Sequence, residues 1–174
     1  SVEIQRNDSV AFDHLTAFTS KGYNSKDIIM QGDLLHVDFG ITYLRLNTDI
    51  QEHAYVLKPN ETNAPLYLQK AMETGNRLQD ILTSQFEENK TGNQILASAL
   101  AQAKKENINA TIYTHPIGFH GHAAGPAIGM WDMQGGVPGA GEYKMRPKTC
   151  YSIELNAMHT IQGWNSPVRI ALEQ

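Results

Sequence analysis

Apolar residues along the chain mark a series of short strands and two helices. Residues 33–42 form an apolar run containing Val, Phe and Ile, and its length and composition favour a buried strand. A second strand is expected over residues 49–57, with Pro59 after it, and residues 43–48 are expected to form a turn or short connector. The two strands together predict an antiparallel, hairpin-like unit.

Further along, apolar residues recur every three to four positions over residues 64–88, which predicts an amphipathic helix. A second helix is expected over residues 92–105. Thr91 and Gln94 precede its first apolar residues with the Thr-x-x-Gln spacing of a capping box.

Two strands are expected near the end of the chain, over residues 151–156 and 168–173, because apolar and polar residues alternate there. A glycine- and histidine-rich stretch separates them from the helices. The order strand, strand, helix, helix, glycine-rich loop, strand, strand predicts an α+β fold with a largely antiparallel sheet.

Composition narrows the class of protein. The chain has 174 residues, enough for one domain with a sizeable core. Its net charge of -4 argues against a nucleic-acid-binding protein, and no apolar run approaches the roughly 20 residues that span a bilayer. Cys150 is the only cysteine, which excludes an intrachain disulfide scaffold.

Because the chain starts at Ser1 and stops at Gln174 just after a strand, we expect a fragment of a longer protein. The cytoplasm is slightly favoured as its compartment, and export of the parent protein stays open.

Glycine and histidine are concentrated in one region. Eight of the 14 glycines lie between Gly118 and Gly141, and His115, His120 and His122 lie at the start of the same stretch. Such backbone freedom together with imidazole groups is typical of a functional loop.

Four acidic residues occupy unusual positions. Asp38 lies inside an apolar strand, where an isolated carboxylate is unfavourable unless a cation or hydrogen bonds compensate. Asp49 opens the next strand, so the two carboxylates can face each other across the ladder. Glu154 and Glu173 pose the same question in the two later strands. Each carboxylate alone is also explained by an ion pair or a solvated face, but the four together favour a shared cation.

Carboxylates with an imidazole suit divalent Mn, Co, Zn or Fe. Four carboxylates are too many for one zinc ion, but they suit a pair of ions bridged by shared carboxylates. The lack of cysteine ligands argues against a structural zinc site. The histidine ligand is expected from the His115–His122 stretch. For His115 and His122, a ligand role is favoured over a structural one.

The ordered set Asp, Asp, His, Glu, Glu, in which the second aspartate follows eleven positions after the first, resembles the pita-bread metallopeptidases. These comprise methionine aminopeptidase, prolidase and Xaa-Pro aminopeptidase, and the chain is most similar to the Xaa-Pro aminopeptidase-like branch. The resemblance covers roughly residues 30–174. The stretches that carry it are residues 32–40, 48–50, 115–118, 152–155 and 170–173.

The resemblance implies a fold and a domain organisation. The expected architecture is the pita-bread fold: a curved antiparallel sheet flanked by helices, in two pseudo-symmetric halves. Residues 1–174 would form a metallopeptidase catalytic domain that is truncated at its N-terminus. Residues 1–31 would be a partial N-terminal segment and residues 32–174 the core that carries the five ligands.

The resemblance also implies a site with two divalent metal ions. Asp38 would bind one metal, Asp49 and Glu173 would bridge both, and His115 and Glu154 would complete the second metal's coordination.

Catalytic and substrate-binding roles follow from the same resemblance. Glu154 would also transfer a proton, and His122 would contact the substrate carbonyl, with His120 as a second substrate-binding residue. The implied reaction is hydrolysis of a peptide bond near the N-terminus of a peptide by a metal-activated water. A peptide is therefore the expected partner, and a homodimer stays open.

Two departures and two alternatives accompany this hypothesis. The family usually has a histidine some 17 or 18 residues before the first metal aspartate, where this chain has Ser20 and Lys21. After Asp49 the chain has Gln51 and Glu52, where aminopeptidases often have Arg, so Xaa-Pro specificity stays open.

A metal-free peptide- or histone-binding module and a creatinase-like amidinohydrolase are the alternatives, and the complete ligand set argues against both.

Overall fold

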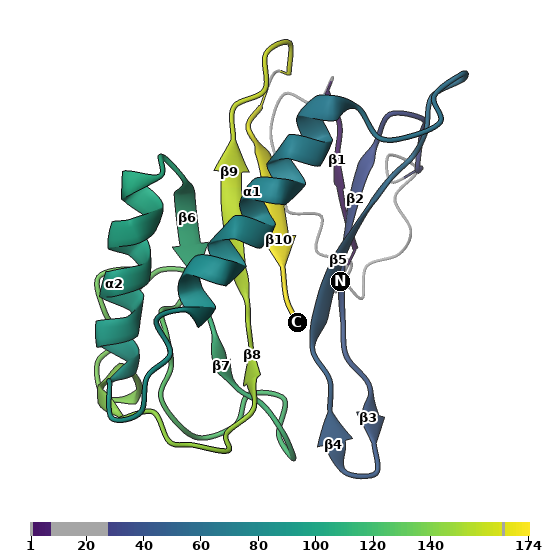
Figure 1. The fold of residues 1–174 in the computed structure, drawn as a ribbon. Coiled ribbons are helices and arrows are strands. Elements are labelled where there is room, and N and C mark those ends of the chain that lie inside the picture. Colours follow the sequence, from purple (N-terminus) through teal and green to yellow (C-terminus); the bar gives the residue numbers. More distant parts are fainter. Residues whose placement is uncertain (1, 8–27, 165) are drawn as a thin grey trace.

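The computed structural model describes residues 2–7, 28–164 and 166–174. The fold is α+β, with short strands and two α-helices in the described residues (Figure 1). Ser20 and Lys21, which stand where the family usually has a histidine, lie outside these residues. Neither helix in the described part combines the length and apolar character needed to cross a membrane.

The first sheet contains three antiparallel strands in the order β1-β2-β5: β1 (Val2–Gln5), β2 (Leu34–Phe39) and β5 (Ile50–Tyr55). The two strands expected from the apolar runs are therefore confirmed, and β1 is an addition. In the register of β2 and β5, Asp38 pairs with Gln51. Asp49 lies just before β5, so the two aspartates are diagonal neighbours rather than directly opposed.

The sequence predicts a turn or short connector over residues 43–48, but in the structure a second small hairpin extends from this sheet. It consists of β3 (Thr42–Tyr43) and β4 (Leu46–Asn47). Leu44 and Arg45 connect the strands with φ values of 49° and 68°. A tight two-residue turn with positive φ at both positions normally uses Asn or Gly, so Leu-Arg gives no sequence signal for it.

The second sheet has the order β10-β9-β6 and is also antiparallel: β6 (Asn109–Ile112), β9 (Leu155–His159) and β10 (Val168–Leu172). A separate short pair consists of β7 (His115–Pro116) and β8 (Tyr151–Ser152). The strand expected over residues 151–156 is thus divided into β8 and β9. Glu154 lies in the interruption between them.

Helices α1 (Leu66–Thr83) and α2 (Gly92–Lys105) cover one face of the second sheet (Figure 1). The expected capping box of α2 is present: Gln94 N donates to Thr91 Oγ1 at 3.2 Å, and Thr91 N donates to Gln94 Oε1 at 2.9 Å. Helix α1 ends earlier than expected, although Phe86 beyond it still packs against the core. The fully buried side chains at this interface include Leu78, Ile81, Leu82, Ile95, Leu96, Leu155 and Ile170.

One glycine allows α1 to approach the sheet closely. A Cβ atom at Gly75 would lie 2.8 Å from Ile170 Cγ2 and 3.0 Å from Leu172 Cδ1. A side chain there would push α1 away from β10.

The two sheets meet where β5 lies beside the end of β10 (Figure 1). Gln51 N donates to the carbonyl oxygen of Glu173 at 3.1 Å. This bridge brings the acidic residues of the first sheet next to those of the second.

Candidate metal centre

The five sequence-predicted ligands come from five separate segments. Asp38 belongs to β2 and Asp49 immediately precedes β5, while His115 begins β7. Glu154 lies between β8 and β9, and Glu173 follows β10 directly.

The fold brings all five residues together, with His122 beside them. Three groups offer ligand atoms within 4.8 Å of one another. Glu173 belongs to two of these groups, and so do Asp49 and His115, so the groups form one connected cluster. The groups are Asp38, Asp49 and Glu173; His115, Glu154 and Glu173; and Asp49, His115 and His122.

The environment of His115 fits a cation. Its Nδ1 lies 3.1 Å from the carbonyl oxygen of Pro116, which can only accept, so Nδ1 carries the hydrogen. In the neutral imidazole, Nε2 therefore presents a lone pair. It lies 3.7 Å from Glu154 Oε2 and 3.6 Å from Glu173 Oε1, too far for hydrogen bonds, and it is buried without a hydrogen-bond partner among the described residues. Three groups with lone pairs that face one another are the donor set that a divalent ion requires.

The pKa values of the carboxylates also indicate that negative charge is crowded in this cluster. Burial, followed by the charges of Glu173 and Asp38, raises the pKa of Asp49 to about 6. Burial and the charge of Glu173 raise the pKa of Glu154 to about 9. Without a cation, crowded carboxylates reduce their repulsion by keeping a proton, and a bound divalent ion would replace that proton.

Two polar side chains hold the glutamates in place. Ser152 Oγ donates to Glu173 Oε1 at 2.6 Å. Gln51 Nε2 donates to Glu154 Oε1 at 2.6 Å and to Glu173 Oε2 at 2.7 Å. In the sequence Gln51 stood out only as a departure from the family. The available signal was its position two residues after Asp49, because side chains of a strand that are two apart share a face.

His122 lies at the exposed side of the cluster. Its ring stacks on that of His115, with centroids 4.0 Å apart, and its Nε2 is 4.0 Å from Asp49 Oδ2. Its Nδ1 lies 2.9 Å from the hydroxyl of Tyr113, whose ring also contacts Trp131. An aromatic wall therefore adjoins the solvent-facing side of the site.

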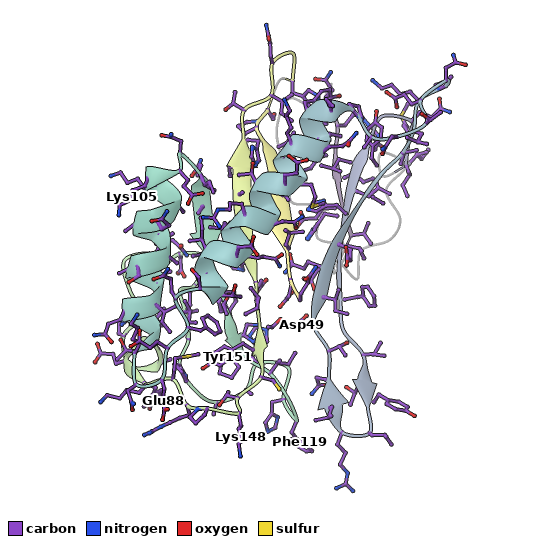
Figure 2. All side chains as sticks on the ribbon, viewed as in Figure 1. Asp49, Glu88, Lys105, Phe119, Lys148 and Tyr151 are labelled. Atoms are coloured by element: carbon purple, nitrogen blue, oxygen red, sulfur yellow. The ribbon has the colours of Figure 1, made fainter. Side chains whose placement is uncertain are left out.

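His120 is not brought into the cluster. It is exposed, and its ring contacts that of Phe119. The β3–β4 hairpin supports this loop, because Asn47 N donates to the Gly118 carbonyl at 2.8 Å and Asn47 Nδ2 donates to the Phe119 carbonyl at 2.7 Å. Figure 2 shows Asp49 at the junction of the two sheets and Phe119 on the loop that adjoins it.

Comparison with known proteins adds a family to this geometry. The profile of metallopeptidase family M24 matches residues 4–172. The X-Pro aminopeptidase from Thermotoga maritima has a TM-score of 0.62 at 17% identity, over 98% of this chain and 42% of that one. The prolidase from Thermococcus sibiricus has a TM-score of 0.61 at 18% identity, over 99% of this chain and 40% of that one.

The same fold also occurs outside proteins described as peptidases. The N-terminal domain of the FACT complex subunit SPT16 from Cicer arietinum has a TM-score of 0.61 at 13% identity, over 99% of this chain and 38% of that one. A search of the curated proteins finds no significant match. The chain spans about two fifths of the length of these structural relatives. The profile match over nearly the whole chain, together with this architecture, shows that the chain belongs to metallopeptidase family M24 and has the pita-bread fold.

Proposed function

We propose that this chain is the catalytic domain of a peptidase that uses two divalent metal ions to hydrolyse a peptide bond near the N-terminus of its substrate. Xaa-Pro aminopeptidases and prolidases are the nearest functional comparison. The observation that carries the proposal is the buried, unpartnered Nε2 of His115, which faces Glu154 and Glu173 within a cluster of four carboxylates.

The residues divide into two groups that share a carboxylate. Asp38, Asp49 and Glu173 would hold one ion, and His115, Glu154 and Glu173 the other, consistent with their mutual distances. When bound, such ions supply a nucleophilic water at neutral pH and polarise the scissile carbonyl.

The protein's own groups would handle protons and charge. Glu154 accepts a proton and returns it to the leaving amine. Burial, followed by the neighbouring glutamate charges, raises the pKa of Tyr113, so its hydroxyl stays protonated and can donate to His122 Nδ1. His122 Nε2 then carries a hydrogen that it can donate to the carbonyl oxygen, where negative charge develops.

A peptide-binding module without metal is the second candidate. It rests on the fold alone, which the N-terminal domain of the FACT complex subunit SPT16 shares. The two candidates differ in one measurable property, because only the peptidase needs bound metal.

The test uses the full-length protein. Metal analysis of the purified protein, paired with a dipeptide and Xaa-Pro peptide library, should reveal bound divalent metal and hydrolysis that chelation abolishes. Asp38→Asn should remove both properties. The matched control is Asp80→Asn on the exposed face of α1, which should change neither. Metal binding and hydrolysis that Asp38→Asn leaves unchanged would refute the proposal.

A further inference from the structure

Gln51 has a buried side-chain amide whose hydrogen-bonding groups all face polar side chains. It is only 3% exposed. Its Nε2 donates to one oxygen of Glu154 and one oxygen of Glu173, and its Oε1 lies 2.9 Å from His36 Nε2. Because the ionised carboxylate of Glu173 only accepts hydrogen bonds, the NH2 group must face the glutamates and Oε1 must face His36.

His36, on the same face of the first sheet, fixes the orientation of the amide. His36 Nε2 donates to Gln51 Oε1, and His36 Nδ1 lies 3.4 Å from Glu3 Oε2. Glu3 in turn bonds the guanidinium of Arg169 on β10. The hydrogen-bonded set thus comprises His36, Gln51 and the two glutamates, and a flipped amide would lose its bonds to all three.

The amide also decides which glutamate oxygens face His115. It occupies Glu154 Oε1, which leaves Oε2 as the oxygen near His115 Nε2. For Glu173 it occupies Oε2, and Oε1, which also accepts from Ser152, is the oxygen near the same nitrogen. Two like-charged groups are therefore held in one arrangement by a common neutral donor.

We infer that Gln51 is a positioning residue of the metal centre, which presets the side-chain rotation of Glu154 and Glu173 and so sets the affinity for divalent ions. The inference rests on the proposed function. Gln51 is not itself a ligand, because its donors point at the carboxylates and its acceptor is taken by His36. Groups that hold metal ligands in orientation typically change metal affinity by about 10- to 100-fold when they are removed.

The experiment measures Mn²⁺ binding to the metal-depleted full-length protein by titration calorimetry. Gln51→Leu keeps a similar volume and removes all three hydrogen bonds, and Gln51→Asn keeps the amide on a shorter side chain that cannot reach both glutamates. Both variants should bind Mn²⁺ about 10- to 100-fold more weakly than the natural protein. The matched control is Gln5→Leu, because Gln5 is equally buried but bonds only the backbone of Arg169. It should lower the thermal midpoint without changing the Mn²⁺ affinity.

The outcomes separate the two proposals. Natural Mn²⁺ affinity in either folded Gln51 variant overturns the positioning role and leaves the proposed function intact. An equal loss of affinity in Gln5→Leu also overturns it, because general destabilisation would then account for the effect. If the natural protein binds no Mn²⁺, or if Asp38→Asn binds it as well as the natural protein does, the proposed function fails and this inference fails with it. If Gln51→Leu does not fold, Gln51→Asn decides.

Discussion

The imidazole rings of His115 and His122 are stacked, with centroids 4.0 Å apart and planes inclined by 14°. His115 is buried among carboxylates, whereas the side chain of His122 is 59% exposed. Under the proposed function, the buried His115 presents a nitrogen to the ligand cluster and the exposed His122 presents one to the substrate.

This difference predicts opposite effects of two substitutions. His115→Ala should abolish tight binding of one divalent ion. His122→Ala should leave metal binding unchanged and lower kcat by about 100- to 1,000-fold, the typical effect of losing a donor to a developing oxyanion. Tyr113→Phe should lower kcat less, because His122 loses only the partner that orients it. Mn²⁺ titration and steady-state kinetics of the full-length protein measure both properties, and loss of metal from His122→Ala would instead identify His122 as a ligand.

Bound metal should stabilise the folded protein through Glu173. At a free Mn²⁺ concentration 1,000 times the Kd, each ion should raise the free energy of unfolding by about 4 kcal/mol. Glu173→Gln should lose most of this effect, because Glu173 belongs to two of the ligand groups. Glu142→Gln, at an exposed position, is the control. Thermal unfolding with and without Mn²⁺ gives the comparison, and equal stabilisation of both variants would contradict the shared role.

The metal-free protein should lose stability as pH rises from 7 to 9. The pKa of Glu154 is raised from 4.5 to about 9 in the folded state, so the folded protein binds more protons than the unfolded chain in this interval. Stability then falls with pH. His115 acts in the same direction: burial lowers its pKa, but the Glu173 carboxylate, the Pro116 carbonyl and the charge of Asp49 more than offset this and raise the pKa overall.

The measurement is the thermal midpoint in chelator across that pH range. Glu154→Gln should show a clearly smaller dependence, since an amide does not titrate. An unchanged slope in this variant would show that other groups dominate.

Close packing of α1 against β10 should make Gly75 intolerant of a branched side chain. Gly75→Val should lower the free energy of unfolding by about 1–3 kcal/mol, because its methyl groups would overlap Ile170. Asn76→Val places the same side chain at an exposed position of the same helix and is the control for helix propensity. Chemical denaturation of the two variants separates packing from propensity, and equal losses would contradict the steric explanation.

Much of the fold was predictable because its signals are local. The apolar run around Asp38, the alternation in residues 168–173 and the capping box at Thr91 each depend on a few neighbouring residues, and all three are present in the structure. The unusual positions of the acidic residues were equally visible, because an aspartate inside an apolar strand is unfavourable without a partner.

The remaining features depend on contacts between distant segments. The β3–β4 turn places Leu44 and Arg45 at positive φ, a conformation that these residue types do not predict. The interruption at Glu154 follows from pairing with two different strands, β7 on one side and β6 on the other. The hydrogen bonds of Gln51 reach 103 and 122 residues along the chain, a distance over which no spacing rule applies.

The contacts of Asn47 with the loop at residues 118–119 join two parts of the chain that carry no proposed metal ligand themselves. Their union fixes the β3–β4 hairpin against the loop that follows His115, and both segments carry exposed apolar side chains, among them Tyr43, Leu46 and Phe119. Insertions or substitutions there can change this surface while the ligand cluster stays as it is. Related chains can in this way differ in the surface they present while keeping the same arrangement of carboxylate and imidazole groups.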